Sequence, residues 1–254
     1  MSFTVFVFGT IVGSFLNVVI LRLPVPDESI VFPPSRCPVC NTRLQWYDNI
    51  PLLSFLLLKR KCRSCGELIS WQYPLVEFSM GLISLALYDK FLISSQFLIF
   101  FIYCAALLVI IFIDFYHQII PDVISLPGII LGFACSFFNP GLTWSDSGLG
   151  ILLGGGIFYG VSAGYYLFTK RIGMGGGDIK LLAMIGAFQG WQSLPFVIFA
   201  SSVAGIIAGI RAMAEQKKGG RTVIPYGPFL AGAGMVYLFF EQPIQSLLRM
   251  IYQV

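Results

Sequence analysis

The sequence predicts an all-helical protein that crosses a membrane several times. Hydrophobic residues make up 57% of its 254 residues, charged residues only 11%, and the mean hydropathy is +0.83. Soluble domains carry about 25% charged residues, so the composition argues against a soluble fold. A spanning helix needs ~20 largely apolar residues, and apolar runs recur along the whole chain. We expect about eight transmembrane helices and a small cytoplasmic loop domain.

Eight apolar runs follow one another from the N-terminus, and each predicts a membrane helix. We do not expect the first run to be a removed signal peptide, because no basic residue precedes it and Arg22 follows it. The runs cover residues 3–21, 73–88, 91–113, 123–138, 148–169, 179–190, 195–210 and 227–240.

The number of spans depends on residues 181–210, a stretch of 30 uncharged residues that is long for one span and short for two. Segment 22–72 carries seven Lys and Arg residues, so the positive-inside rule places it in the cytoplasm and the N-terminus outside. If the stretch turns near residues 190–195, the basic loop 211–221 also falls inside. A single span would leave that loop outside, so two spans are predicted.

This topology divides the chain into three parts. Residues 1–21 form the first transmembrane helix, residues 22–72 a cytoplasmic loop domain, and residues 73–254 a membrane-embedded domain. A loop of this size is too small to build a sufficient core of its own. A cross-link or a bound metal ion must therefore stabilise the loop.

The loop contains four cysteines in two C-x-x-C pairs, which could provide this stabilisation. Cys37 pairs with Cys40 and Cys62 with Cys65, with 21 residues between the pairs. Disulfides are rare in the cytoplasm, and four thiolates at this spacing are typical of a tetrahedral structural zinc site. Two redox-active pairs are the alternative. Bound zinc would stabilise the loop domain.

Two aspartates stand out in a chain that otherwise avoids charge. Asp114 ends an uncharged run, and Asp178 closes the glycine-rich segment 173–178. The topology places both at the cytoplasmic face, and an acid at the edge of a membrane span is a candidate functional residue. Two adjacent carboxyl groups tend to share one proton, so one can accept a proton from water while the other donates one. The pattern predicts peptide hydrolysis at a membrane.

A structural role is the alternative for each acid. Asp178 would then cap a helix, and Asp114 would be a residue at the membrane edge. Asp122 and Asp146 fit such a role well. The glycines before Asp178 favour catalysis, because they let a substrate backbone approach closely. Glu77, just inside the second span, is either catalytic or an interfacial carboxylate paired with a loop arginine.

In combination, these segments resemble the bacterial type IV prepilin peptidases, the bifunctional leader peptidases and N-methyltransferases of type IV pilus and type II secretion systems. The match keeps its order over nearly the whole chain. Its segments are residues 13–19 (GSFLNVV), the cysteine pairs with 49–51 (NIP) between them, 73–77 (YPLVE), 113–114 (ID), 120–122 (IPD), 175–180 (GGGDIK) and 224–229 (IPYGPF).

The resemblance implies removal of the short basic leader of prepilins and pseudopilins, followed by methylation of the new N-terminal residue with S-adenosylmethionine. It implies that Asp114 and Asp178 are catalytic and that residues 73–254 form an aspartyl protease domain. The four-cysteine zinc loop matches the bifunctional branch of the family. The resemblance also implies a multi-pass protein of the bacterial inner membrane, surrounded by lipid, with its active site at the cytoplasmic face and no nucleic-acid partner.

Substrate and methyl donor need binding groups of their own. We expect the extended substrate to lie across three glycines, Gly175, Gly176 and Gly177. No glycine-rich nucleotide motif is visible for the donor. The candidates for methyl transfer are polar residues in otherwise apolar family segments: Asn17, Asn49 and Glu77.

A transporter is the main alternative from another functional class. Residues 148–169 hold seven glycines, and broken glycine-rich helices near intramembrane acids occur in carriers. No inverted repeat is visible, however, and both acids fall on one membrane face. A membrane-anchored zinc scaffold is a third class, for which both aspartates would be dispensable.

Overall fold

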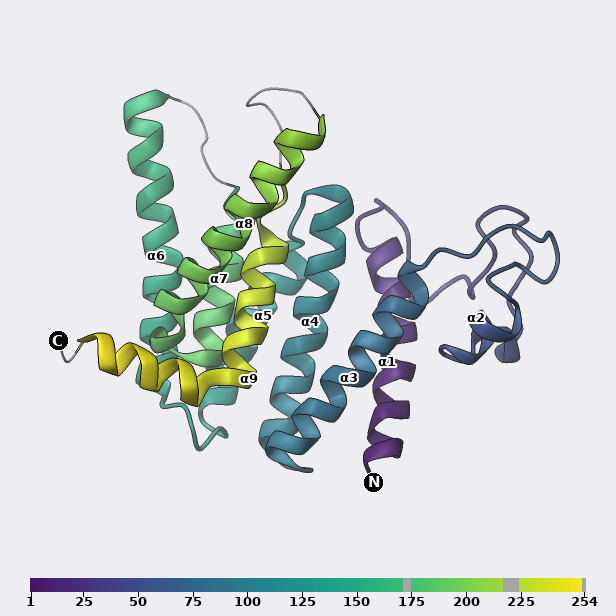
Figure 1. The fold of residues 1–254 in the computed structure, drawn as a ribbon, viewed down its shortest axis with the longest axis horizontal. Helices are drawn as coiled ribbons and strands as arrows, with labels where there is room; N and C mark the ends of the chain where they lie inside the picture. The colour runs from purple at the N-terminus through teal and green to yellow at the C-terminus, as the bar shows by residue number, and fades with distance from the viewer. Residues whose placement is uncertain (171–174, 217–223, 253–254) are drawn as a thin grey trace. The chain divides into compact units, whose positions relative to one another are not determined.

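A computed structural model describes residues 1–170, 175–216 and 224–252, and the regular secondary structure of these residues is helical (Figure 1). Two isolated antiparallel β-bridges occur in the cysteine-containing segment. The chain divides into two compact units, Met1–Val109 and Ile110–Val254, and the boundary falls within helix α4 (Ser95–His117). The all-helical prediction is confirmed.

In the first unit, helices α1 (Ser2–Arg22) and α3 (Gln72–Phe91) pack against each other. Glycine allows this close approach, because a Cβ atom at Gly9 would lie 2.7 Å from the carbonyl oxygen of Met80. The hydroxyl of Ser84 on α3 donates a hydrogen bond to the backbone of α1 at 3.0 Å. Small residues and interhelical hydrogen bonds are common means of helix association in membranes.

The cysteine-containing segment connects these two helices. It contains a 3-10 turn, η1 (Trp46–Asn49), and a short helix, α2 (Leu53–Leu57). Phe55 on α2 is buried, and its ring centroid lies 5.0 Å from that of Trp71. Leu57 stays 80% exposed, so this apolar stretch is only partly buried.

The boundary between α3 and α4 differs from the prediction. Helix α3 continues to Phe91, and Leu92 then adopts a positive φ of 52°, which ends the helix. Helix α4 begins at Ser95 and continues to His117. The predicted span 91–113 is therefore wrong at both ends, because hydrophobicity alone does not show where the backbone turns.

The second unit is a bundle in which α7 is central. Helix α7 packs against α5, α6 and α9, and its residues 181–188 are all buried. A kink at Phe240 divides α9. The helices that complete this unit are α5 (Asp122–Ser136), α6 (Trp144–Thr169), α7 (Gly176–Gln189), α8 (Leu194–Gln216) and α9 (Gly227–Tyr252).

Close backbone contacts hold α7 between its neighbours. A side chain at Gly150 on α6 would collide with the backbone of Gly186 on α7. The Ser147 hydroxyl donates a hydrogen bond to the carbonyl oxygen of Ala187 at 2.7 Å. On α9, a backbone carbonyl accepts a hydrogen bond from Gln189 Nε2 at 2.7 Å. These contacts set the position of α7 relative to α6 and α9.

The uncharged stretch 181–210 forms two helices, as predicted. Helix α7 ends before Gly190, whose φ is +76°, and a 3-10 turn, η2 (Trp191–Ser193), leads into α8. The Ser193 hydroxyl donates a hydrogen bond to the Gly190 carbonyl oxygen at 2.7 Å. Glycine adopts a positive φ without steric cost, which explains the break at this position.

Among the described residues, four helices are long and apolar enough to cross a membrane: Ser2–Arg22, Ser95–His117, Trp144–Thr169 and Trp191–Ala214. These helices support a multi-pass membrane protein. Eight spans are not confirmed, since α5 has 15 residues and α7 has 14, fewer than the ~20 that a span needs.

Candidate functional site

The two predicted catalytic aspartates both lie in the second unit. Asp114 is in the last turn of α4 and only 5% exposed. Asp178 is the third residue of α7 and is half-buried. The N-cap of α7 is Gly175, so the alternative in which Asp178 caps the helix is wrong. The two carboxyl groups are close enough to interact electrostatically.

Asp114 is held by the start of α9. The backbone N–H of Gly227 donates a hydrogen bond to Asp114 Oδ2 at 2.9 Å. A Cβ atom at this glycine would lie 2.7 Å from the same oxygen, so no side chain fits beside the carboxylate. The preceding Tyr226 hydroxyl lies 2.8 Å from the hydroxyl of Ser201 and 3.2 Å from that of Ser202. These contacts tie the segment before α9 to α8.

Sequence reasoning assigned no role to Gly227 or Tyr226, although segment 224–229 contributes to the family resemblance. The hydrogen bond to Asp114 connects residues that are 113 positions apart. A glycine beside prolines also reads as an ordinary helix start. Only the contact itself shows that this glycine is part of the site.

The glycine-rich segment before Asp178 has one crowded position and two open ones. Residues 173 and 174 lie outside the described residues. A Cβ atom at Gly177 would lie 2.8 Å from Cβ of Ile120, a residue that also contacts the start of α9. At Gly176 a Cβ atom would meet nothing within 4 Å, and at Gly175 it would meet only Asp178 Oδ2, at 3.5 Å. Among the described residues, the positions beside Gly175 and Gly176 are therefore open, and the position beside Gly177 is filled.

The other two conspicuous acids have structural partners. Lys180 Nζ lies 2.7 Å and 2.8 Å from the two carboxylate oxygens of Asp122. Thr143 Oγ1 donates a hydrogen bond to Asp146 Oδ2 at 2.6 Å and accepts one from the backbone N–H of Asp146 at 3.1 Å. The latter pair caps the start of α6. Both acids therefore have the structural role that the sequence suggested.

The four cysteines of the C-x-x-C pairs come together in the first unit, with their sulfur atoms within 4.8 Å of one another. Cys37 Sγ lies 3.9 Å from Cys65 Sγ, and Cys40 Sγ lies 4.0 Å from Cys62 Sγ. Four sulfurs at ~2.3 Å from a tetrahedral zinc ion would be about 3.8 Å apart. A disulfide requires about 2.05 Å, and all four thiols are free. The cluster could hold a metal ion.

Both cysteine pairs lie in the same type of backbone turn. In each, the N–H of the first cysteine donates to a carbonyl oxygen five residues ahead, at 3.0 Å and 2.8 Å. The residue after each pair has a positive φ, +55° at Asn41 and +75° at Gly66. Hydrogen bonds with the side chain and backbone of Thr42 lower the pKa of Cys40 to about 6. This shift favours the thiolate, which is the form that binds metal.

The thiol of Cys65 is shifted in the opposite direction. A backbone hydrogen bond with Glu67 lowers its pKa, but desolvation and the neighbouring cysteines outweigh this effect and raise the pKa to about 12. Four negative sulfurs so close together repel one another. A cation is therefore needed for all four to be thiolates at once.

A cavity of about 970 Å³ lies in the same unit, between the cysteine segment and the ends of α1 and α3. All three candidate residues for methyl transfer line it: Asn17, Asn49 and Glu77. Residues that are far apart in the sequence thus share one wall. Cavities of this volume are at the upper end of those that bind small molecules.

Glu77 is buried in the floor of this cavity. It accepts a hydrogen bond from the backbone N–H of Leu52 at 2.8 Å, and Ser14 lines the same cavity. Within the described residues no lysine or arginine forms an ion pair with it, so the suggested pairing with a loop arginine is wrong. The Glu77 carboxylate instead binds the backbone N–H of Leu52, a residue with an unusual φ of +62°.

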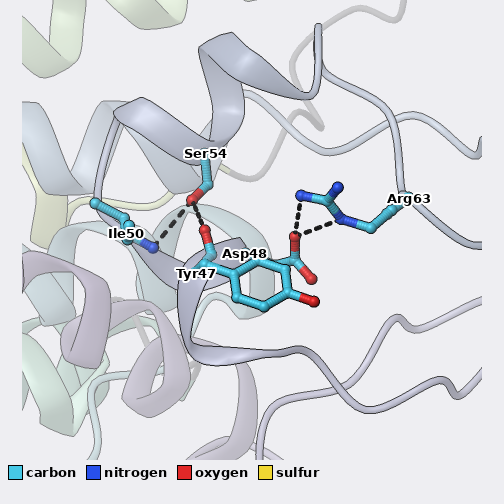
Figure 2. Close-up of polar contacts among 5 residues, drawn as sticks. All are labelled: Tyr47, Asp48, Ile50, Ser54 and Arg63. Carbon is cyan, nitrogen blue, oxygen red and sulfur yellow. Dashed lines mark hydrogen bonds and ion pairs between the residues drawn. The ribbon is translucent and has the colours of Figure 1, made fainter.

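Segment 47–63 is held by polar contacts of its own (Figure 2). The Ser54 hydroxyl donates to the Tyr47 carbonyl oxygen at 2.8 Å and accepts from the Ile50 N–H at 3.0 Å. The Asp48 carboxylate binds the guanidinium of Arg63 at 2.8 Å. Since Arg63 lies inside the second C-x-x-C pair, this contact connects the cavity wall to the cysteine cluster.

Two family models match the chain. The Bacterial Peptidase A24 N-terminal domain matches residues 7–91, and the Type IV leader peptidase family matches residues 101–210. The first match contains the cysteine cluster and the cavity residues. The second contains both aspartates.

The chain is also similar to proteins named prepilin leader peptidase/N-methyltransferase. The protein of Stutzerimonas stutzeri is 39% identical over 94% of this chain and 91% of its own length. That of Pseudomonas aeruginosa is 36% identical over 93% of this chain and 89% of its own length. No solved structure matches the chain. None of these matches supports the transporter alternative.

Proposed function

Because the chain belongs to the type IV leader peptidase family, we propose that it removes the leader of prepilins and pseudopilins and then methylates the new N-terminal residue. Its relatives are named for both activities. The two family matches divide between the units, apart from residues 101–109. We assign cleavage to the second unit and methylation to the first.

The pairing of Asp114 and Asp178 is the observation that carries the proposal for cleavage. The two residues lie 64 positions apart and on different helices, yet both belong to one unit. Ile120 lies beside Gly177, which precedes Asp178, and beside Gly227, which binds Asp114. Gly227 fixes one carboxylate, and open space at Gly175 and Gly176 lies beside the other. This arrangement supplies both a proton donor and a proton acceptor next to a place for a peptide.

The chemistry follows from the positions of the hydrogen bonds. Asp114 Oδ2 accepts the Gly227 N–H, so the proton shared by the two carboxyl groups resides on one of the other oxygens. The ionised carboxyl group takes a proton from water, and the water oxygen attacks the scissile carbonyl carbon. The protonated group donates its proton to the carbonyl oxygen. Collapse of the tetrahedral intermediate, with proton transfer to the leaving amine, completes hydrolysis.

The glycine loop has the shape needed to bind an extended substrate. A prepilin segment would lie beside Gly175 and Gly176, where no side chain interferes, and its backbone groups would pair with those of the loop. Gly177 has a different task, because Ile120 occupies the space beside it. Of the three glycines, two would serve the substrate and one the packing of the loop.

The cysteine cluster would hold zinc, and the topology would place the site at the inner face of the bacterial membrane. Four thiolates at these distances match tetrahedral zinc better than the oxygen-preferring Ca²⁺ and Mg²⁺. Cys37, Cys40, Cys62 and Cys65 are the proposed ligands. The seven basic residues in segment 22–72 favour its cytoplasmic location.

The test uses the purified full-length protein in detergent, a prepilin substrate and mass spectrometry of the product. Asp114→Asn and Asp178→Asn should each lower cleavage by more than ~1000-fold, because each removes one partner in proton transfer. Asp122→Asn is the matched control and should retain most activity. Both catalytic variants should still be monodisperse and still methylate a prepilin that was cleaved beforehand.

Leader removal at a normal rate in either aspartate variant would rule out the pair. Leader removal without methyl transfer by the unmodified protein would leave the peptidase assignment intact and refute the second activity.

A further inference from the structure

The floor of the cavity in the first unit contains two polar atoms without a hydrogen-bond partner among the described residues: Asn17 Oδ1 and Gln72 Nε2. Both side chains are at least nine-tenths buried, with 1% and 9% exposure. A buried polar atom without a partner costs ~1–3 kcal/mol. Such groups call for an explanation in a ligand or an ordered water molecule.

The same floor contains a carboxyl group that has no cationic partner among the described residues. Glu77 accepts a hydrogen bond from an uncharged group, the backbone N–H of Leu52. Burying a carboxylate is expensive unless a cation or several donors compensate it. A ligand with a positively charged group and hydrogen-bonding edges would satisfy the floor as a whole.

We infer that this cavity binds the methyl donor S-adenosylmethionine, with Glu77 facing a cationic or hydroxyl-bearing part of it, Asn17 Oδ1 accepting a hydrogen bond from it and Gln72 Nε2 donating one to it. This inference rests on the proposed methyltransferase function. When bound, the donor supplies a methyl carbon on a positively charged sulfur. The N-terminal amine of the cleaved pilin takes that methyl group and loses one proton, which leaves a neutral thioether.

The shape of the cavity fits this ligand class. Its volume of about 970 Å³ exceeds what a single small molecule requires, so a nucleoside donor leaves room for the end of a peptide. Tyr73 and Phe55 line it and offer aromatic surface to an adenine ring. Asn17 Nδ2 is already used, since it donates to the Tyr73 carbonyl oxygen at 3.1 Å. This bond fixes the amide and leaves its oxygen for a ligand.

Residues 47–54, which lie between the two cysteine pairs, cover the cavity and form its roof. Their contacts explain why methylation should depend on the cysteine cluster. The Asp48–Arg63 ion pair connects the roof to the second cysteine pair. Leu52 belongs to the roof, and its backbone N–H donates a hydrogen bond to the Glu77 carboxylate. A displaced roof would open the floor to water and weaken donor binding.

Direct binding tests the inference without reference to activity. Calorimetry of the full-length protein with S-adenosylmethionine should show that Glu77→Gln weakens binding by about 10-fold or more, equivalent to about 1.4 kcal/mol. Asp89→Asn is the matched control, because this carboxylate lies on the same helix as Glu77, is exposed and does not line the cavity. It should change the affinity by less than ~2-fold.

Asn17→Leu separates ligand binding from folding. If Asn17 Oδ1 serves a ligand, leucine should weaken donor binding about 10-fold. The melting temperature should change little, because removal of the unpartnered oxygen offsets the loss of the hydrogen bond from Nδ2 to the Tyr73 carbonyl oxygen. Photo-cross-linking of the donor should label peptides around residues 14–17 or 72–77. Cross-links confined to the second unit, or wild-type affinity in Glu77→Gln, would overturn the assignment. Prepilin cleavage by the same variants would still stand and would keep the proposed peptidase separate.

Discussion

The two units hold their functional groups in place by different physical means. In the second unit, α7 is buried by neighbouring helices, and glycines bring the backbones of α6 and α7 into contact. The cysteine segment of the first unit has little core, since Trp46 and Leu57 are 78% and 80% exposed. Its order comes from four sulfurs and a few polar contacts. A substitution that disturbs the helix packing of the second unit should therefore affect one activity, and one that disturbs the cysteine cluster should affect the other.

Replacement of a cluster cysteine should produce the largest difference between the methylation and cleavage activities. Cys62→Ser should lower the methylation of a previously cleaved pilin by more than ~100-fold, because a structural metal supplies folding energy to a segment that lacks a core. Prepilin cleavage should fall by less than ~3-fold. Cys135→Ser, a cysteine outside the cluster, is the control. Equal losses of both activities would show that the two units do not act separately.

Crowding beside Asp178 should produce the converse result. Gly177→Val should lower cleavage by ~100-fold, because the new side chain would displace Ile120 or the loop and misplace the carboxylate. Methylation of a previously cleaved pilin should change little. Gly156→Val, at a helical glycine with open space around it, is the control. Normal cleavage by Gly177→Val would refute the role of the tight loop.

A methyl group next to Asp114 should have a somewhat smaller effect. Gly227→Ala should lower kcat for cleavage about 10-fold, since the added Cβ atom would lie 2.7 Å from Asp114 Oδ2 and push the carboxylate away. Gly232→Ala on the same helix meets no neighbour and should behave like wild type. An unchanged kcat in Gly227→Ala would show that this contact does not position the catalytic group.

The hydrogen bonds of Tyr226 should contribute less. Tyr226→Phe removes the hydroxyl that contacts Ser201 and Ser202, and a lost hydrogen bond of this kind corresponds to about 1 kcal/mol. We expect a ~5-fold loss of kcat with an unchanged KM. Tyr159→Phe, at a tyrosine that is 67% exposed, is the control. A change in KM alone would assign Tyr226 to substrate binding instead.

The smallest effect should come from the surface ion pair. Asp122→Asn weakens the contact with Lys180, whose side chain is 36% exposed while that of Asp122 is 56% exposed. Exposed pairs contribute ~0–1 kcal/mol, so thermal unfolding should shift slightly and cleavage should persist. A severe loss of cleavage would mean that Asp122 takes part in catalysis.

Much of the site could be predicted from the sequence because its chemistry appears in local patterns. The C-x-x-C pairs predicted a metal cluster, and the structure brings the four sulfurs together. Asp114 and Asp178 were selected because charge is rare and costly in apolar segments. The break near Gly190 was predicted from the length of an uncharged run together with the positive-inside rule. For the cysteines and the aspartates a short segment contains the whole physical reason, whereas the break required the basic residues of several loops.

Other features could not be predicted, because they depend on residues distant in the chain. Gly227 became part of the site only through its hydrogen bond across 113 positions. A catalytic role and pairing with a loop arginine were both open for Glu77 from the sequence. The structure shows its carboxylate accepting a hydrogen bond from the backbone N–H of Leu52. The end of α3 was misjudged because Leu92 is as apolar as its neighbours, and its positive φ leaves no trace in composition.

The sequence by itself determined the helical membrane class, the cysteine pairs that could hold a metal and the two candidate acids, because each follows from composition or from spacing along one segment. Only the tertiary structure decided which backbone group holds Asp114, which glycine of the loop is crowded, and which polar residues share a cavity. The physical reason is that these properties belong to distances between helices. Such distances are set by packing summed over many side chains, and no single segment records them.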